Sequence, residues 1–327
     1  MVGRNIRGDF LEKYVNLSET LHRIVEGVFE NLRDRSPAAI GFYPGNKQAL
    51  SEMIRECYLS EFGPRSLPKV NPGGPRRIIA CVSPHAGYYY SGPVAAHLYK
   101  AIADDGKPES FVLIGPSHMG YPGASIMVEG NWIMPGGRVP VDTALAKAII
   151  SNAPIILDDA RAHNEEHSLE VQLPFLQELY KDLKIVPIAL GMSDWETCEE
   201  VGRGVAAAIK EEKANAIIIA STDLTHYGAM YGYAPAGTKP IEKIIKWVHD
   251  TDGEIISKIE ALDAQGLLTL VRTKDLTMCG AAPVTSAIVA AKELGATKGI
   301  KLQYATSYDI RGSSDAIVGY LSAIMIK

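Results

Sequence analysis

The chain has 327 residues, of which 46% are hydrophobic and 22% charged, and its formal net charge is -5. This is ordinary globular composition, so we expect an extensive buried core and not a disordered chain. A negative net charge disfavours nucleic-acid binding, in spite of the local lysines Lys239, Lys243 and Lys246. No apolar run reaches the roughly 20 residues that a membrane helix needs, and the N-terminus lacks the apolar centre of a secretion signal. We therefore expect a soluble, cytoplasmic protein.

The N-terminal region has the pattern of a helical cap. Apolar residues recur at helical spacing over residues 21–32 and again over 47–59. The Pro- and Gly-rich stretch 63–75 that follows is typical of a surface connection. We expect an N-terminal cap at 1–62 and a main body at 76–327, together forming one compact domain.

From residue 76 onward, short apolar runs alternate with segments of helical periodicity. Continuous apolar runs predict strands that are buried on both faces, and the helices between them would provide that cover. Strands are expected at about 78–82, 111–114, 185–190, 216–220, 302–307 and 317–326, and helices at about 94–103, 143–151, 170–180, 196–211 and 283–294. The predicted fold is α/β, with a central, mostly parallel or mixed sheet covered by helices.

Three of the predicted strands are each followed within a few residues by a histidine. His85 and His118 follow the first two strands, and Asp223 and His226 follow the strand at 216–220. In open α/β sheets, ligands bind outside the carboxyl ends of the strands. A single histidine is more often structural, but three at one sheet edge would rarely arise independently. Because imidazole is a common metal ligand and a general base near neutral pH, the pattern predicts a metal-capable cleft.

A cysteine joins these histidines as a candidate ligand or nucleophile. Cys279 lies just ahead of a predicted helix, where a thiolate gains from the helix N-terminus and from nearby cations. The other cysteines, Cys57, Cys81 and Cys198, lie inside predicted helices or strands and are typical of small buried hydrophobes. The four show no paired spacing of a disulfide framework or a zinc site.

The segment from 163 to 170 combines histidines with carboxylates at a helix entrance. His163 and His167 are four residues apart and would share a helical face, so a second metal site is one interpretation. The segment lacks the His-Glu-x-x-His order of a metalloprotease helix. We favour the interpretation that His163, Glu166, His167 and Glu170 orient the primary ligands. Glu166 and Glu170 would also act as ordinary stabilising charges in the first turn of a helix.

Six short motifs follow one another in a fixed order along the chain. They are GFYP at 41–44, PHAGY at 84–88, GPSH at 115–118, EHSLE at 166–170, STDLTHY at 221–227 and MCG at 278–280. Each motif is weak alone, but the ordered set, from about residue 40 to the C-terminus, resembles the Memo (mediator of cell motility) family. That family is similar in fold to the class III extradiol dioxygenases, non-haem iron enzymes that open catechol rings.

The resemblance implies roles for five residues. His85 and His118 correspond to the two histidine ligands of the dioxygenases, and Cys279 stands where those enzymes place a glutamate. Asp223 and His226 are implied to be catalytic residues of the same pocket, with His226 near the acid/base histidine. Iron or copper is the implied cofactor. Because a thiolate is softer than a carboxylate and is itself oxidisable, we do not expect efficient catechol ring cleavage.

Three classes of function remain open from the sequence. The leading hypothesis is a metal-dependent redox protein of dioxygenase-like architecture that takes a small molecule in its cleft. The cleft could instead bind a peptide or a partner protein, or a metal-bound water with a histidine base could make the protein a hydrolase. By resemblance to prokaryotic Memo proteins, a radical-SAM protein and an AMMECR-type protein are candidate partners.

Overall fold

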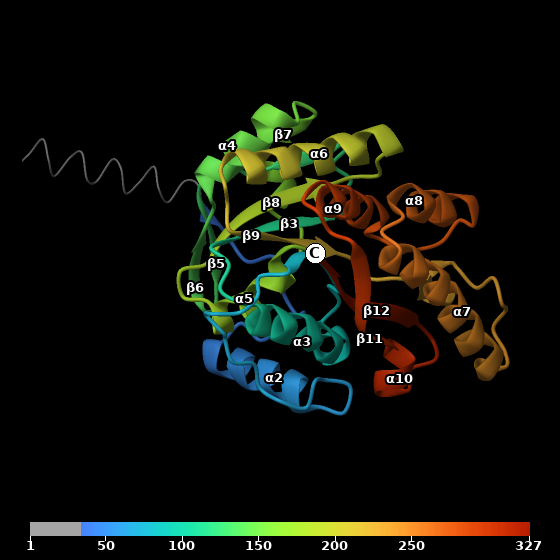
Figure 1. The fold of residues 1–327 in the computed structure, drawn as a ribbon. Helices are drawn as coiled ribbons and strands as arrows, with labels where there is room; N and C mark the ends of the chain where they lie inside the picture. The colour runs from blue at the N-terminus through green and yellow to red at the C-terminus, as the bar shows by residue number, and fades with distance from the viewer. Residues whose placement is uncertain (1–33) are drawn as a thin grey trace, which may run out of the picture.

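The computed structural model describes residues 34–327, which form a single α/β domain around a mixed sheet (Figure 1). The strands of this sheet are β2 (Ile78–Ser83), β3 (Ser110–Pro116), β4 (Ala124–Ile126), β7 (Ile156–Asp158), β8 (Lys184–Leu190), β9 (Ala216–Ser221), β10 (His226–Tyr227), β11 (Lys298–Thr306) and β12 (Ile317–Ile326). Among the described residues the strand order is β10-β12-β2-β9-β3-β8-β4-β7, and β11 pairs with β12. The helix expected at 21–32 lies outside the described residues.

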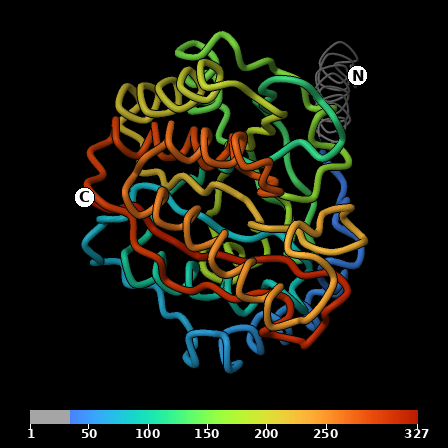
Figure 2. Tube along the Cα trace, turned by 90° about the vertical axis from the view of Figure 1, so that its right-hand side faces the viewer, coloured from blue at the N-terminus to red at the C-terminus, as the bar shows by residue number. Residues whose placement is uncertain are grey.

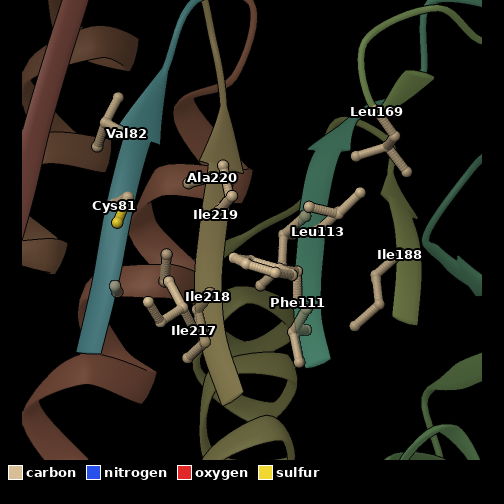
Figure 3. Close-up of a cluster of buried hydrophobic side chains, with 14 of the residues drawn as sticks. Cys81, Val82, Phe111, Leu113, Leu169, Ile188, Ile217, Ile218, Ile219 and Ala220 are labelled. Atoms are coloured by element: carbon tan, nitrogen blue, oxygen red, sulfur yellow. The ribbon is translucent and has the colours of Figure 1, made fainter. Parts of the chain in front are cut away.

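The four central strands explain why the sheet was recognisable from sequence. Strands β2, β9, β3 and β8 run parallel, whereas β12 is antiparallel to β2 and β4 is antiparallel to β8. Nearly all consecutive residues along these strands are buried, so both faces of the sheet are covered. Figure 3 shows Phe111, Leu113 and Ile188 in a cluster of buried hydrophobic side chains. Because the central strands are parallel, their carboxyl ends lie at one edge of the sheet.

Helices cover both faces of the sheet. They are α2 (Lys47–Leu59), α3 (Tyr88–Asp105), α4 (Thr143–Asn152), α5 (Leu173–Leu179), α6 (Trp195–Glu211), α7 (Ile241–Glu260), α8 (Ala264–Thr273), α9 (Ala281–Glu293) and α10 (Ser307–Arg311), with 3₁₀ turns η1 (Ala160–His163), η2 (Glu170–Gln172) and η3 (Ala229–Tyr231). Helix α3 contacts β2 and β12 on one face. Helix α9 contacts β2, β3 and β9 on the other and lies beside α6 in both views (Figure 2).

Side-chain caps fix where several helices begin. Asn46 accepts hydrogen bonds from the N–H groups of Gln48 and Ala49 at the start of α2. Asp142 and Asp194 cap α4 and α6 in the same way. Each cap satisfies backbone donors that have no partner within the helix.

The predicted N-terminal cap is partly integrated into the main core. Leu50, Ile54 and Cys57 of α2 are buried in the same hydrophobic cluster as the central strands. A small second sheet, formed by β1 (Asp34–Arg35), β5 (Asn131–Met134) and β6 (Gly137–Pro140), also ties the first described residues to the body.

Two helices of the C-terminal half, α7 and α8, were not predicted. Buried apolar residues recur at helical spacing in both, so the signal was present in the sequence. Lys246, one of the lysines noted as a local basic contact, forms an ion pair with Asp250 one turn further along α7 at 2.6 Å.

None of the helices in the described part of the chain is long and apolar enough to cross a membrane.

Candidate metal centre

The structure brings His85, His118 and Cys279 together beyond the carboxyl ends of the central strands. His85 follows β2, His118 follows β3, and Cys279 lies two residues before α9. Ligand atoms of the three side chains all lie within 4.8 Å of one another. His85 Nε2 and Cys279 Sγ lie 3.2 Å apart. Three segments that are far apart in sequence therefore offer two imidazoles and one thiol to a common point.

Hydrogen bonds fix the tautomer of His85. Its Nδ1 lies 2.9 Å from Ser221 Oγ. The Ser221 hydroxyl donates its single proton to the carbonyl oxygen of Ser168 and also accepts from Gln172 Nε2. Ser221 can therefore only accept from His85, so Nδ1 carries the proton and Nε2 presents its lone pair to Cys279. Burial is the main reason why the pKa of His85 lies well below its ordinary value, and the charges of the neighbouring histidines lower it further. The ring is therefore neutral.

Glu166 fixes the tautomer of His118 in the same way. Its carboxylate receives the His118 Nδ1–H at 3.0 Å and the His118 backbone N–H at 2.6 Å. Burial alone would raise the pKa of Glu166. The hydrogen bond and charge of His118, with the backbone N–H groups of Ser168 and His118, lower that pKa to about 2. An ionised Glu166 accepts hydrogen bonds only, so the free lone pair of His118 is on Nε2, the arrangement common in histidine metal ligands.

The surroundings of Cys279 differ from the expected thiolate environment. Burial, followed by the charge of Asp223, raises the pKa of the thiol, and no cation enters to lower it among the described residues. The backbone N–H of Asp223 donates to Sγ at 3.2 Å, which partly opposes these effects. The helix N-terminus therefore does not suffice to ionise Cys279, and a bound cation would be needed to displace its proton.

A glycine allows Cys279 to approach the sheet. A Cβ at Gly280 would lie 2.4 Å from both the carbonyl oxygen of Ser221 and Cβ of Thr222. The backbone N–H of Gly280 instead donates to Thr222 Oγ1 at 2.9 Å. This close contact holds the start of α9, and with it Cys279, against the end of β9.

Asp223 and His226 lie on the loop after β9. Asp223 accepts a hydrogen bond from the backbone N–H of His85 at 2.9 Å and so anchors that loop. Burial raises the pKa of Asp223, and the charge of His226 opposes the rise. His226 Nδ1 lies 3.1 Å from the carbonyl oxygen of Leu224 and 3.0 Å from that of Thr277. Because carbonyl oxygens only accept, His226 Nδ1 carries a proton, and in the neutral ring the lone pair is therefore on Nε2.

His167 adds a third imidazole beside the predicted ligands. Its ring stacks on His118 at 4.5 Å and stands nearly perpendicular to His85 at 5.5 Å. Phe42 packs against its ring at 4.5 Å. Burial, followed by the charge of His118, lowers the pKa of His167 to about 4. His167 is thus neutral near pH 7.

The second metal site considered from sequence paired His163 with His167, but the structure groups His167 with His118 and Glu166 instead. Ligand atoms of His118, Glu166 and His167 also lie within 4.8 Å of one another. Glu166 already accepts the Nδ1–H of His118, and His167 Nδ1 lies 3.6 Å from the same carboxylate. His163, the other half of the predicted pair, is not part of this group.

His163 and Glu170 do not orient the candidate ligands. His163 is fully buried, and neither of its ring nitrogens has a hydrogen-bond partner within residues 34–327. Glu170 instead forms a buried ion pair with Arg35 and accepts hydrogen bonds from the Tyr43 hydroxyl and from the backbone N–H of Ala38. The interpretation as ligand-orienting residues therefore needs correction for these two, because η2 directs Glu170 toward the N-terminal segment and away from the histidines.

A cleft of about 340 Å³ opens beside the cluster, and His118 and Cys279 contribute to its wall. Much of the remaining lining is apolar and comes from Leu190, Leu268, Val271, Leu276 and Ala282. Volume and apolar lining of this kind are typical of small-molecule sites with a few polar groups.

Sequence reasoning missed three residues that complete the centre. Ser221 and Gln172 fix the His85 tautomer, and Phe42 packs on His167. Ser221 is the last residue of β9, so its position at the sheet edge was a usable signal. Phe42 lies in the GFYP motif, but that motif does not reveal its contact with His167, and no pattern in the sequence points to the contacts of Gln172.

The family model described as Memo-like protein matches residues 35–324. The chain belongs to the Memo family. A MEMO1 family protein of Methanopyrus kandleri is 40% identical over 294 residues, which cover 89% of this chain and 98% of the relative. A Memo relative from Methanothermobacter thermautotrophicus is 42% identical over 288 residues, covering 88% of this chain and 98% of its own. The sequence resemblance to the Memo family is thereby confirmed.

A solved structure supports the Memo fold. An uncharacterized protein from Escherichia coli K12 aligns with a TM-score of 0.51 at 15% identity, covering 77% of this chain and 100% of that protein. At this identity the similarity shows a shared α/β architecture and nothing about activity.

The buried ion pair of this Memo protein predicts a large effect of one substitution. Glu170→Ala should lower the free energy of unfolding by about 3–5 kcal/mol, because Arg35 would remain buried without its partner. Urea denaturation followed by circular dichroism measures the loss. Glu165→Ala, at an exposed position in the same segment, should change it by no more than about 0.5 kcal/mol. Equal effects of the two substitutions would contradict the assigned role of Glu170.

The raised pKa of Cys279 predicts slow alkylation of the metal-free protein. At pH 8, iodoacetamide should modify Cys279 on the order of tenfold or more slowly than a free thiol of pKa about 8.5, and the rate should rise with pH. Mass spectrometry of the modified peptide measures the rate, and Cys279→Ser is the control for labelling of the buried cysteines. Fast, pH-independent modification near pH 7 would show a thiolate and contradict the effect of burial.

Proposed function

We propose that this Memo protein holds iron or copper at His85, His118 and Cys279 and uses it for redox chemistry on a small molecule. The observation that carries the proposal is the 3.2 Å approach of His85 Nε2 to Cys279 Sγ, with a ligand atom of His118 within 4.8 Å. Both imidazoles have their Nδ1–H committed to an acceptor, so in the neutral ring each Nε2 offers its lone pair to a metal.

The donor set fits iron or copper better than it fits a hard cation. Imidazoles and a thiol are the ligands that soft and borderline transition metals prefer, whereas calcium and magnesium prefer oxygen. When bound, such a metal would supply one-electron chemistry and the activation of O₂ or of a reducible substrate. The thiol in place of a carboxylate argues against efficient catechol ring opening, since a thiolate is softer and is itself oxidisable.

The surrounding residues have defined tasks in this proposal. His226 Nε2 is a proton acceptor, since its Nδ1–H is held by two carbonyl groups. Asp223 positions His85 through the backbone N–H and helps to set the charge of the pocket. The apolar walls of the cleft hold the substrate and exclude water from the reacting groups.

A comparison of two substitutions tests the assignment of the ligands. Cys279→Ser should lower the affinity for Cu(I) by more than Asp223→Asn does. The serine removes a soft ligand, and the asparagine should cost at most the roughly 10- to 100-fold typical of a residue that orients ligands. Anaerobic competition titration with a Cu(I) chelator measures both affinities. Equal losses would mean that Cys279 is not a primary ligand.

Oxygen consumption tests the redox part of the proposal. Protein reconstituted anaerobically with iron or copper should consume O₂ with small reductants, and Cys279→Ser should abolish the uptake. The Fe(II) form should not open catechols at the ordinary enzyme rate of about 1 to 10³ per second, whereas Cys279→Glu rebuilds a dioxygenase-like ligand set and should gain slow ring opening. Rapid ring opening by the unaltered protein would restore the dioxygenase as its function.

A further inference from the structure

The cleft beside the candidate ligands carries one permanent cation on a largely apolar wall. Arg272 is the only lysine or arginine among the described residues that line it. Leu190, Leu268 and Leu276 contribute to the apolar part of the wall. A ligand that fills such a cleft takes water away from the charged group beside it, which is costly unless the ligand supplies a partner. The cleft therefore selects its ligand by charge as well as by shape.

A hydrogen bond fixes where the guanidinium of Arg272 lies. Arg272 belongs to α8, and its Nη2 donates to the backbone carbonyl oxygen of Ser193, in the loop between β8 and α6. Ser193 is buried and also lines the cleft. The bond thus joins two walls of the cleft, and the charged end of Arg272 lies where these walls meet.

Most of the donors of Arg272 are uncommitted. A guanidinium has five N–H donors, and within residues 34–327 the side chain makes only the hydrogen bond to Ser193 and no ion pair. Asp194 is the acidic neighbour on this side. Its hydrogen bonds with Thr197 are the main cause of its lowered pKa, and the charge of Arg272 lowers it further. The Asp194 carboxylate, however, caps α6 by accepting the Thr197 N–H at 2.9 Å. Arg272 is therefore available to a ligand.

Asp275 limits how negative that ligand can be. It also lines the cleft. Burial is the main cause of the raised pKa of Tyr233, and the charge of Asp275 raises it further, so this carboxylate acts toward Tyr233 and not toward Asp194. One guanidinium with one carboxylate on the same cleft suits a monoanion better than a dianionic phosphate, which Asp275 would repel more strongly.

We infer that the cleft binds a small monocarboxylate with an apolar body, and that Arg272 recognises the carboxylate. The planar guanidinium can bind a carboxylate through two parallel hydrogen bonds, which fixes the orientation of the ligand as well as its charge. The leucines of the wall contact the apolar body. The inference rests on the proposed function and deepens it, because it names the substrate class of the same site. Arg272 acts in binding and specificity, and it makes or breaks no bond.

Two probes of the same shape test the role of the charge. 3-Phenylpropionate carries a carboxylate and an apolar ring, and 3-phenylpropanamide has a neutral amide in place of the carboxylate. Isothermal titration calorimetry with the metal-free full chain measures the affinity for each. Arg272→Gln should weaken 3-phenylpropionate roughly tenfold, equivalent to about 1.4 kcal/mol, and should change the affinity for the amide by less than about twofold. Arg272→Lys should recover part of the loss, because it keeps the charge without the paired donors.

A remote arginine provides the matched control. Arg203 lies on α6, pairs with Glu199 at 2.8 Å and does not line the cleft. Arg203→Gln should bind both probes as the unaltered protein does. No binding of 3-phenylpropionate at millimolar concentration would overturn the inference. So would an equal loss of both probes in Arg272→Gln, which would indicate a change in cleft shape, or the same loss in Arg203→Gln. Tighter binding of phenyl phosphate than of 3-phenylpropionate would overturn the choice of a monocarboxylate.

Protection of Cys279 locates the bound probe. Saturating 3-phenylpropionate should slow the modification of Cys279 by iodoacetamide, because the probe fills the cleft that this residue lines. The same concentration should protect Cys279 much less in Arg272→Gln. An unchanged rate of modification in the unaltered protein would place the probe elsewhere and overturn the inference.

These measurements separate the inference from the proposed metal site, because they use metal-free protein. If Cys279→Ser binds Cu(I) as tightly as the unaltered protein, the metal site is wrong, and the probe affinities still decide whether Arg272 binds a carboxylate. If Cu(I) binding depends on Cys279 but the affinity for 3-phenylpropionate does not depend on Arg272, only the inference about the substrate class is overturned.

Discussion

The hydrogen bond between His85 Nδ1 and the Ser221 hydroxyl is the contact on which the rest of the centre depends. Since the Ser221 proton is already donated to Ser168, the imidazole must supply the proton of this bond. The same constraint applies to His118, which meets a carboxylate, and to His226, which meets two carbonyl groups. In the neutral form of each ring the proton is therefore on Nδ1 and the lone pair on Nε2, so the hydrogen bonds orient the ligand atoms before any cation arrives.

The fold produces this arrangement with little dependence on individual loops. Parallel β2, β3 and β9 end at one edge, and the residues that follow them must lie near one another. Of the three candidate ligands, only Cys279 does not follow a strand of the sheet. The close contact at Gly280 places the start of α9, and with it Cys279, against the end of β9. A site assembled from strand ends on a buried sheet is rigid, because moving one ligand requires moving a strand of the core.

The sequence predicted the parts of the molecule that depend on local pattern. Continuous apolar runs marked the central strands, and the helical period marked α2 at its observed bounds. The positions of His85 and His118 followed from the general behaviour of α/β sheets. The failures depend on tertiary environment: the half-buried thiol of Cys279 lies beside Asp223, which no neighbouring residue in the chain reveals. Likewise, the four-residue spacing of Glu166 and Glu170 suggests a shared role, yet the first contacts His118 and the second Arg35.

The ion pair between Arg35 and Glu170 has a consequence for where this domain can be considered to start. Arg35 lies at the beginning of the described chain, in the two-residue strand β1, and also donates to the backbone carbonyl oxygens of His163 and Glu166. Phe42, a few residues later, packs on His167. A fragment trimmed to the obvious α/β repeat would leave a buried anion without its cation and remove one wall from the imidazole cluster. The minimal unit that keeps the imidazole cluster intact therefore extends at least to Arg35, well ahead of the first strand of the main sheet.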